Sequence, residues 1–215
     1  MPHVLAQSLP YLLEGALVTL WMSLIVVTLG TLLGVALGIV ASIGGRVTRG
    51  LVTAYVFILR GIPVLVVMML GYYIFPALGY RVNAYIAVGI AQIVYIGAFV
   101  AEITRSAVNS VPASQVAAAR ALGMRRGKIL REVVLPQAIR IAIPPLLNNS
   151  LTSIKQTSYV SVVGVWELTY AAREVVERTL ASFQIFLGVM AIYFLLCYPL
   201  SLLARWSERR FLVSH

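Results

Sequence analysis

Residues 17–43, LVTLWMSLIVVTLGTLLGVALGIVASI, contain no charged side chain and lie within a longer uncharged run between Glu14 and Arg46. A helix needs roughly 20 apolar residues to cross the hydrocarbon core of a bilayer. The stretch therefore predicts a transmembrane helix. A cleaved secretory signal is a poor alternative, because the first 14 residues carry no basic segment and the apolar run is too long.

Other uncharged stretches predict further spans at residues 61–78, 84–101 and 184–204. One more span, the fourth of five in chain order and irregular in shape, is expected between Arg140 and Arg173. Two prolines and two charged residues interrupt it: Pro144, Pro145, Lys155 and Glu167. Irregular backbone at membrane depth is tolerated where it faces protein or a watery cavity.

The composition supports a membrane protein, because 60% of the 215 residues are apolar and only 11% are charged. A soluble domain is about half apolar and about a quarter charged. The single cysteine, Cys197, excludes a disulfide framework, and the only histidines, His3 and His215, form no recognisable metal or catalytic site. We expect one all-α polytopic domain over residues 1–215, with no catalytic residue and no enzyme activity of its own.

The basic residues divide unevenly between the expected loops. Segments 44–60, 105–140 and 205–215 carry 13 Lys and Arg, whereas 1–16, 77–83 and 168–183 carry 3. The positive-inside rule places the first group in the cytoplasm. We therefore expect the N-terminus outside and the C-terminus inside, and the net charge of +10 needs no nucleic-acid partner.

Three glycines repeat every fourth residue in the first span, at Gly30, Gly34 and Gly38. Small residues at this spacing let a second helix approach closely. We interpret the stripe as structural packing.

The basic stretch 105–140 is the most informative segment, and its helical pattern runs over about 112–136, the expected cytoplasmic loop. Pro112 can open a helix, an alanine-rich run follows, and Gly123 can end it. Apolar residues then recur at helical spacing: Ile129, Leu130, Val133 and Val134. The segment predicts two short helices at an angle.

This segment resembles the EAA loop of ABC-importer permeases. The residues that carry the resemblance are Ala117, Ala118, Ala119, Gly123, Val133, Leu135 and Pro136. The sequence departs from that motif where Ala117 replaces a glutamate and Val133 an isoleucine. The resemblance implies that these residues couple the membrane domain to a cytoplasmic ABC ATPase dimer.

Other segments resemble the polar amino acid branch of these permeases. They are Arg60-Gly61-Ile62-Pro63, Ala101-Glu102-Ile103-Thr104-Arg105, and the run from Lys155 to Val165 followed by Glu167-Leu168. The resemblance implies a bacterial inner-membrane permease for polar amino acids or related solutes such as opines. It also implies a second permease, identical or homologous, and an extracytoplasmic solute-binding protein, all surrounded by lipid.

Energy must come from another chain. A phosphate-binding loop needs Gly, four residues, then Gly-Lys-Ser/Thr, and residues 123–129, GMRRGKI, have the wrong spacing. We therefore expect no cofactor here and place ATP and Mg²⁺ on the partner ATPase.

The expected substrate path centres on charges in the fourth span, since an ionisable side chain at membrane depth needs a partner or a pathway. Its candidates are Glu167, Lys155, Gln156, Thr157, Ser158 and Ser161, with Gln92 and Tyr95 on the third span. A zwitterion needs groups of both signs, which Lys155 and Glu167 supply. The alternative is that these two residues brace the irregular span, and Glu102 with Arg105 is expected to be a structural pair.

Two other functions remain open. An ATP-independent carrier or small channel would also need a polar path, although carriers often show internal repeats and none is visible here. A membrane scaffold would need only the basic loop, not the polar stretch between Lys155 and Glu167.

Overall fold

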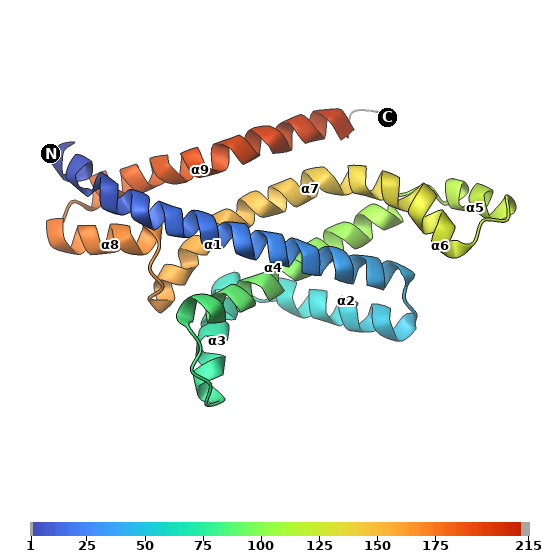
Figure 1. Cartoon of the computed structure of the whole chain (residues 1–215), viewed down its shortest axis with the longest axis horizontal. Coiled ribbons are helices and arrows are strands. Elements are labelled where there is room, and N and C mark those ends of the chain that lie inside the picture. The colour runs from blue at the N-terminus through green and yellow to red at the C-terminus, as the bar shows by residue number, and fades with distance from the viewer. Residues whose placement is uncertain (1, 212–215) are drawn as a thin grey trace.

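The computed structural model describes residues 2–211, with side chains from Val4 onward, and throughout this range the chain is helical without strands. The helices are α1 (Pro2–Ile43), α2 (Arg46–Gly61), α3 (Val64–Ala77), α4 (Ala84–Asn109), α5 (Ala113–Ala121), α6 (Arg126–Ile129), α7 (Leu135–Gln156), α8 (Leu168–Thr179) and α9 (Ser182–Phe211). A π-helical segment, Leu130–Val134, joins α6 to α7, and a 3-10 helix, Thr157–Val163, follows α7. Helices α1, α4, α7 and α9 run lengthwise along the molecule (Figure 1). The all-α prediction is confirmed.

Three described helices are long and apolar enough to cross a membrane: Val4–Ile43, Ala84–Asn109 and Ser182–Phe211. At about 1.5 Å per residue, the 42 residues of α1 are longer than the roughly 30 Å hydrocarbon core. This helix therefore tilts or extends beyond the core.

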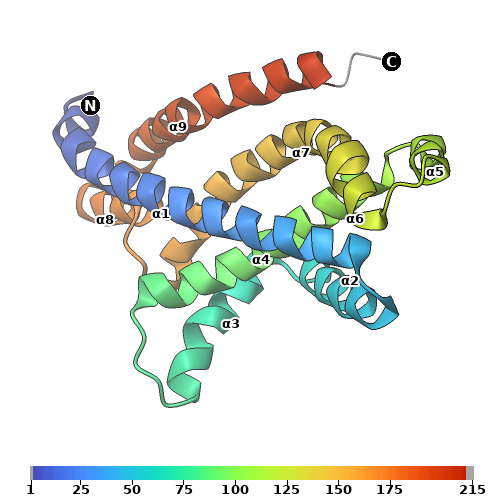
Figure 2. The same cartoon turned by 45° about the vertical axis from the view of Figure 1, so that its right-hand side comes forward.

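The second expected span, residues 61–78, contains the short helix α3 (Val64–Ala77), and the chain bends where this span begins. Residues 46–61, expected to be part of a loop, form α2, which contacts α1 and α4. Helix α3 follows at an angle of 105° and projects from the lengthwise helices (Figure 2). The bend has a local cause, since Pro63 has no backbone N–H and forces Ile62 into extended backbone (φ −107°, ψ 134°).

The fourth expected span is irregular, but not where its prolines lie. Helix α7 continues through Pro144 and Pro145, and the departure from α-helix begins at Thr157. The 3-10 helix ends at Gly164, whose φ of +79° favours glycine. Helix α7 is not among the helices that are long and apolar enough to cross a membrane. The described residues therefore give three such helices, or four if α2 and α3 together form one bent span. The predicted number of five spans is not confirmed.

The expected two-helix loop is only partly separate from the membrane helices. Helix α5 is short and independent, whereas α6 and the π-helical segment run directly into α7. Pro136 lies in the first turn of α7, where proline is tolerated. The second predicted short helix is therefore the beginning of α7.

The glycine stripe of α1 packs against α4, as predicted. A Cβ atom on Gly30 would lie 2.7 Å from the Cβ of Ile96, and one on Gly38 would lie 2.6 Å from the Cβ of Thr104. The two helices form the most extensive pairing in the described chain. Their close approach needs glycine because no larger side chain fits between the backbones.

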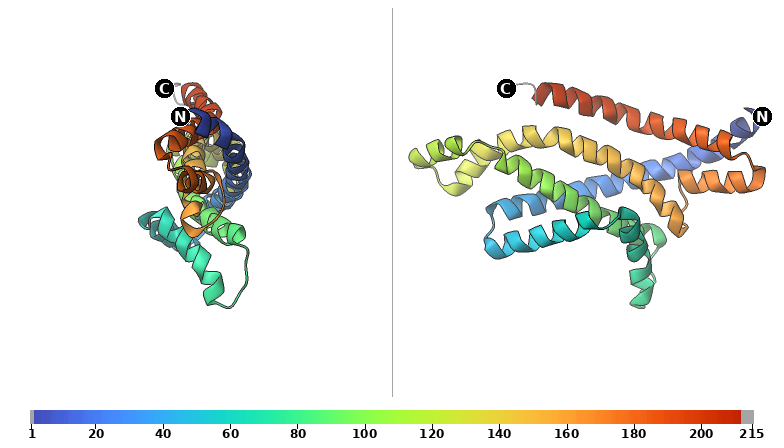
Figure 3. Two further views of the ribbon diagram at one scale, coloured as in Figure 1. Left: turned by 90° about the vertical axis from the view of Figure 1, so that its left-hand side faces the viewer. Right: turned by 180° about the vertical axis from the view of Figure 1, so that it is seen from behind.

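The basic segments gather at one end of the molecule. The start of α2, helices α5 and α6, and the last turns of α9 lie at the end opposite to α8 (Figure 1), and the view from behind shows the same arrangement (Figure 3). The chain thus has one basic end and one end occupied by α8.

Candidate functional site

Glu167 is enclosed at the N-terminus of α8, with none of its surface exposed. One carboxylate oxygen accepts hydrogen bonds from the backbone N–H groups of Thr169 at 2.7 Å and Tyr170 at 3.0 Å. The other oxygen accepts from the hydroxyls of Thr19 at 3.0 Å and Tyr193 at 3.1 Å. Four donors thus compensate the buried charge. Because these donors come from α1, α8 and α9, the carboxylate connects the three helices, which supports the interpretation that Glu167 is a brace.

Lys155 lies in the last turn of α7 and is exposed. It lines a hollow of about 300 Å³ between α7 and α9, together with Tyr193, Phe194 and Cys197. Lys155 and Glu167 form no ion pair in the described part of the chain. Tyr193 links their surroundings, because its side chain lines the hollow and its hydroxyl donates to Glu167.

Gln92, Tyr95 and Gln156 lie elsewhere, where α4 meets α7. Tyr95 and Gln156 line a cavity of about 40 Å³ with Asn149 and Ser153, and the Gln92 side-chain amide donates to the Ser153 carbonyl at 3.3 Å. Gln92 Oε1 and Asn149 Nδ2 are buried without a partner in the described structure. Buried amides normally have partners, and the cavity that Asn149 lines is large enough to hold a water molecule.

The hydroxyls of the 3-10 helix turn back onto their own backbone. Thr157, Ser158 and Ser161 donate to carbonyl oxygens three residues earlier, at 2.6, 2.8 and 2.7 Å. Such bonds offer the backbone an alternative to regular α-helical bonding and often bend a helix, in keeping with the departure from α-helix here. The residues of the expected substrate path therefore lie in three groups rather than in one cluster. One group surrounds Tyr193, the second lies where α4 meets α7, and the third consists of the hydroxyls of the 3-10 helix.

Thr19 and Tyr193 were not predicted from the sequence. Thr19 and Ser23 stand four residues apart in the first apolar run, so one helix face is polar there. The Ser23 hydroxyl reaches Thr157 at 3.4 Å. Two hydroxyl residues on one face of a membrane helix were the available signal for Thr19, whereas nothing in its local sequence distinguished Tyr193.

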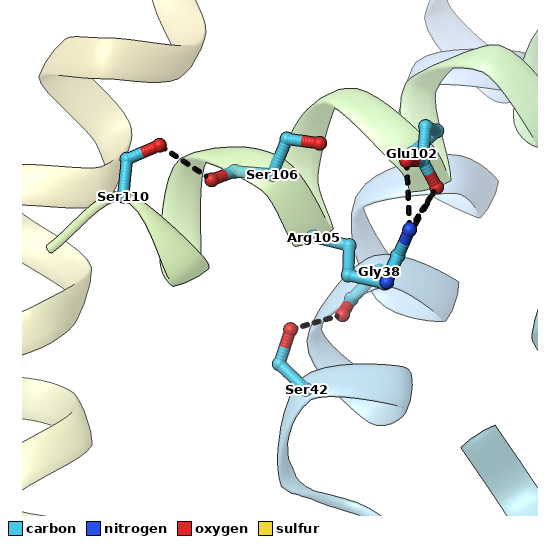
Figure 4. Close-up of polar contacts among 6 residues, drawn as sticks. All are labelled: Gly38, Ser42, Glu102, Arg105, Ser106 and Ser110. Carbon is cyan, nitrogen blue, oxygen red and sulfur yellow. Dashed lines mark hydrogen bonds and ion pairs between the residues drawn. The ribbon is translucent and has the colours of Figure 1, made fainter.

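A larger hollow of about 570 Å³ lies at the bend between α2 and α3. It is lined by Arg60 and by the ion pair of Glu102 with Arg105, whose shortest distance is 2.7 Å. Figure 4 shows this pair on α4, as the sequence predicts. The Arg60 guanidinium lies 5.6 Å from the centre of the Phe99 ring, so this hollow offers both charge signs.

The residues of the expected coupling motif differ in exposure. Ala117 and Ala118 are exposed on α5, whereas Ala119 is buried against the region that includes Ile129. Gly123 ends α5 with a φ of +76°. The remaining motif residues, Val133, Leu135 and Pro136, continue from the π-helical segment into α7, and only Pro136 is exposed.

Residues 30–213 match the family described as binding-protein-dependent transport system inner membrane component. The chain is 34% identical to the glutamine transport system permease protein GlnP of Escherichia coli K12, with 94% of each chain covered. It is 33% identical to the probable glutamine ABC transporter permease protein GlnM of Bacillus subtilis, with 96% of each covered.

Solved structures agree with these relatives. A chain from the crystal structure of an amino acid ABC transporter with histidines is 30% identical, with a TM-score of 0.89 and 96% of each chain covered. A chain of the MetNI methionine ABC transporter is 19% identical, with a TM-score of 0.77 and coverage of 94% and 97%, and supports the fold alone. The chain belongs to the family of inner membrane components of binding-protein-dependent transport systems.

Proposed function

We propose that this chain is the permease that carries a polar amino acid, or a related solute, into the cytoplasm, driven by a separate ABC ATPase dimer. Relatives named for glutamine and L-cystine transport support the substrate class. A second permease, an extracytoplasmic solute-binding protein, and ATP with Mg²⁺ on the ATPase complete the proposed system.

The observation that carries the proposal is the exposed face of α5 at the basic end of the molecule. Ala117 and Ala118 present small side chains there, where a partner backbone can approach closely. Ala119 faces inward and holds α5 in place. We place this end in the cytoplasm because Lys and Arg concentrate in cytoplasmic segments.

The proposed substrate path uses the polar surfaces that remain accessible. Lys155 and Tyr193 line one hollow, and Tyr95 with Gln156 lines the separate small cavity where α4 meets α7. For Glu167 to bind the substrate's amino group directly, the substrate would have to replace one of four existing donors. The geometry favours an indirect role for Glu167, in which its carboxylate fixes the position of the Tyr193 hydroxyl.

Cysteine crosslinking tests the docking face. In a Cys197→Ser background, Ala118→Cys should crosslink to the ATPase that co-purifies with the tagged chain. Glu177→Cys, exposed on α8 at the opposite end, is the matched control and should not. Crosslinking at position 177 without crosslinking at 118 would reverse the proposed orientation.

A further inference from the structure

A separate basic pocket lies where five helices meet at the basic end. Its volume is about 710 Å³, within the range of small-molecule sites. Three arginines line it: Arg49 from α2, Arg120 from α5 and Arg126 from α6. Ser42 at the end of α1 and Asn109 at the end of α4 add polar groups.

The positive charges of this pocket have no acidic counterpart. No Asp or Glu is among its lining residues. Arg49 makes one long contact, from Nε to the Ala41 carbonyl at 3.4 Å, and neither Arg120 nor Arg126 forms an ion pair within the described residues. Three guanidinium groups gathered in this way favour an anion, and their planar donor sets match phosphate oxygens.

The donors available to an anion come from the arginines and Asn109. The Ser42 hydroxyl is already used, since it donates to the Gly38 carbonyl on α1 at 2.8 Å (Figure 4). An anion in this pocket would therefore meet several charged donors at once.

The remaining wall of the pocket is apolar. Ile43, Val108 and Val116 contribute to it, beside Leu130 and Val134. The pocket also lies at the C-terminal ends of α1 and α4, two of the helices that are long and apolar enough to cross a membrane, and it therefore lies close to the lipid headgroups if these helices span the bilayer. A small soluble anion needs no apolar wall, whereas a phospholipid presents a phosphate next to its acyl chains.

We propose that this pocket binds the phosphate group of an anionic phospholipid. Basic pockets between membrane helices are suited to such headgroups. The assignment goes beyond the proposed transport function and does not depend on the transported solute. The lipid would place one negative charge among the three arginines and connect α2, α5 and α6.

The pocket is distinct from the proposed ATPase face. Val116 and Arg120, four residues apart, lie on the pocket side of α5. Ala117 and Ala118 are exposed and do not line the pocket. Lipid and ATPase can therefore contact α5 on different sides.

Native mass spectrometry of the purified full chain in detergent tests the proposal. Dioleoylphosphatidylglycerol and dioleoylphosphatidylcholine are added separately, and bound lipid is counted. The chain should retain phosphatidylglycerol in preference to phosphatidylcholine. Replacing Arg49, Arg120 and Arg126 by Gln should weaken phosphatidylglycerol binding by about tenfold or more, because each basic residue near an anionic lipid adds to the attraction.

The matched control replaces Arg125, Arg131 and Arg140 by Gln. These three arginines are exposed in the same region but do not line the pocket. The control therefore changes the net charge by the same amount as the first triple variant, and phosphatidylglycerol binding should persist. Equal loss in both triple variants would show general charge attraction and overturn the site. Displacement of the lipid by millimolar inorganic phosphate would assign the pocket to a soluble anion and overturn the lipid proposal.

A second variant covers the case in which the triple replacement does not fold. Arg126 is exposed and makes no ion pair within the described chain, so Arg126→Gln alone should leave the fold intact. It should still lower phosphatidylglycerol binding relative to Arg125→Gln. Equal binding by these two single variants contradicts the proposal.

Discussion

At the scale of single residues, the buried carboxylate of Glu167 changes how the charged fourth span is interpreted. The sequence shows a charge at membrane depth, which favours either a substrate contact or an internal brace. The structure supplies four donors from three helices. Those donors are remote in sequence or belong to the backbone, so residue types alone could not reveal how fully the charge is compensated.

Glu167→Gln should therefore destabilise the protein. The amide can accept at only one of its two terminal atoms, so the Thr19 and Tyr193 hydroxyls lose a charged acceptor and keep only the Gly15 carbonyl and the Thr169 hydroxyl as neutral partners, at a cost of roughly 1–3 kcal/mol. The melting temperature of the purified chain should fall by several degrees. Glu177→Gln, exposed on the same helix, is the control and should leave it unchanged.

Substrate separates the two roles of Glu167. If the carboxylate acts as a brace, an added substrate should raise the melting temperature of Glu167→Gln as much as it raises that of the unchanged chain. A direct substrate contact would give the opposite result. Glu167→Gln would then have an unchanged melting temperature without substrate, and added substrate would no longer raise it.

At the scale of elements, glycine has two different structural roles that the sequence predicts well. In α1 it permits close approach, and at the end of α5 it permits a positive φ. Both roles can be predicted from the positions of the glycines relative to neighbouring residues in the sequence. Helix α2 was missed because residues 44–60 carry three arginines and were expected to form a loop, and the bend at Pro63 between α2 and α3 was missed with it.

Gly34→Ala should loosen the contact between α1 and α4. The new Cβ would lie 2.4 Å from the Cβ of Val100 and 2.6 Å from the carbonyl oxygen of Gly97. Overpacking of this kind costs roughly 1–3 kcal/mol, which a thermal melt of the purified chain detects. Gly50→Ala in α2, where a Cβ meets nothing within 4 Å among the described residues, should be neutral or slightly stabilising, and equal effects would contradict the packing.

Gly123→Val should uncouple transport from ATP hydrolysis. A β-branched residue strongly disfavours a φ of +76°, so the end of α5 must rearrange and displace the exposed alanines. Gly127→Val is the matched control, because position 127 is helical and equally open. Substrate-stimulated ATPase activity of the reconstituted complex should fall only in the first variant, and full activity in both would count against a coupling role for α5.

At the scale of the whole molecule, the sequence predicts the helical class, the family and the gathering of basic segments at one end. These properties come from composition, motif spacing and loop charge, all of which are local. The arrangement of the site was less predictable, because Lys155, Glu167 and Gln92 are separated by packing between distant helices. The five predicted spans are not confirmed, since the described residues give three helices that could cross a membrane, or four if α2 and α3 form one bent span.

ATP-driven uptake is the most direct test of the account as a whole. The complex co-purified with the tagged chain is reconstituted in proteoliposomes, with ATP on the side of α5 and labelled glutamine with the solute-binding protein on the side of α8. Ionophores clamp the membrane potential and the ion gradients. The account predicts uptake that requires hydrolysable ATP and stops with a non-hydrolysable analogue. Equal uptake without ATP would contradict it and favour a carrier or channel.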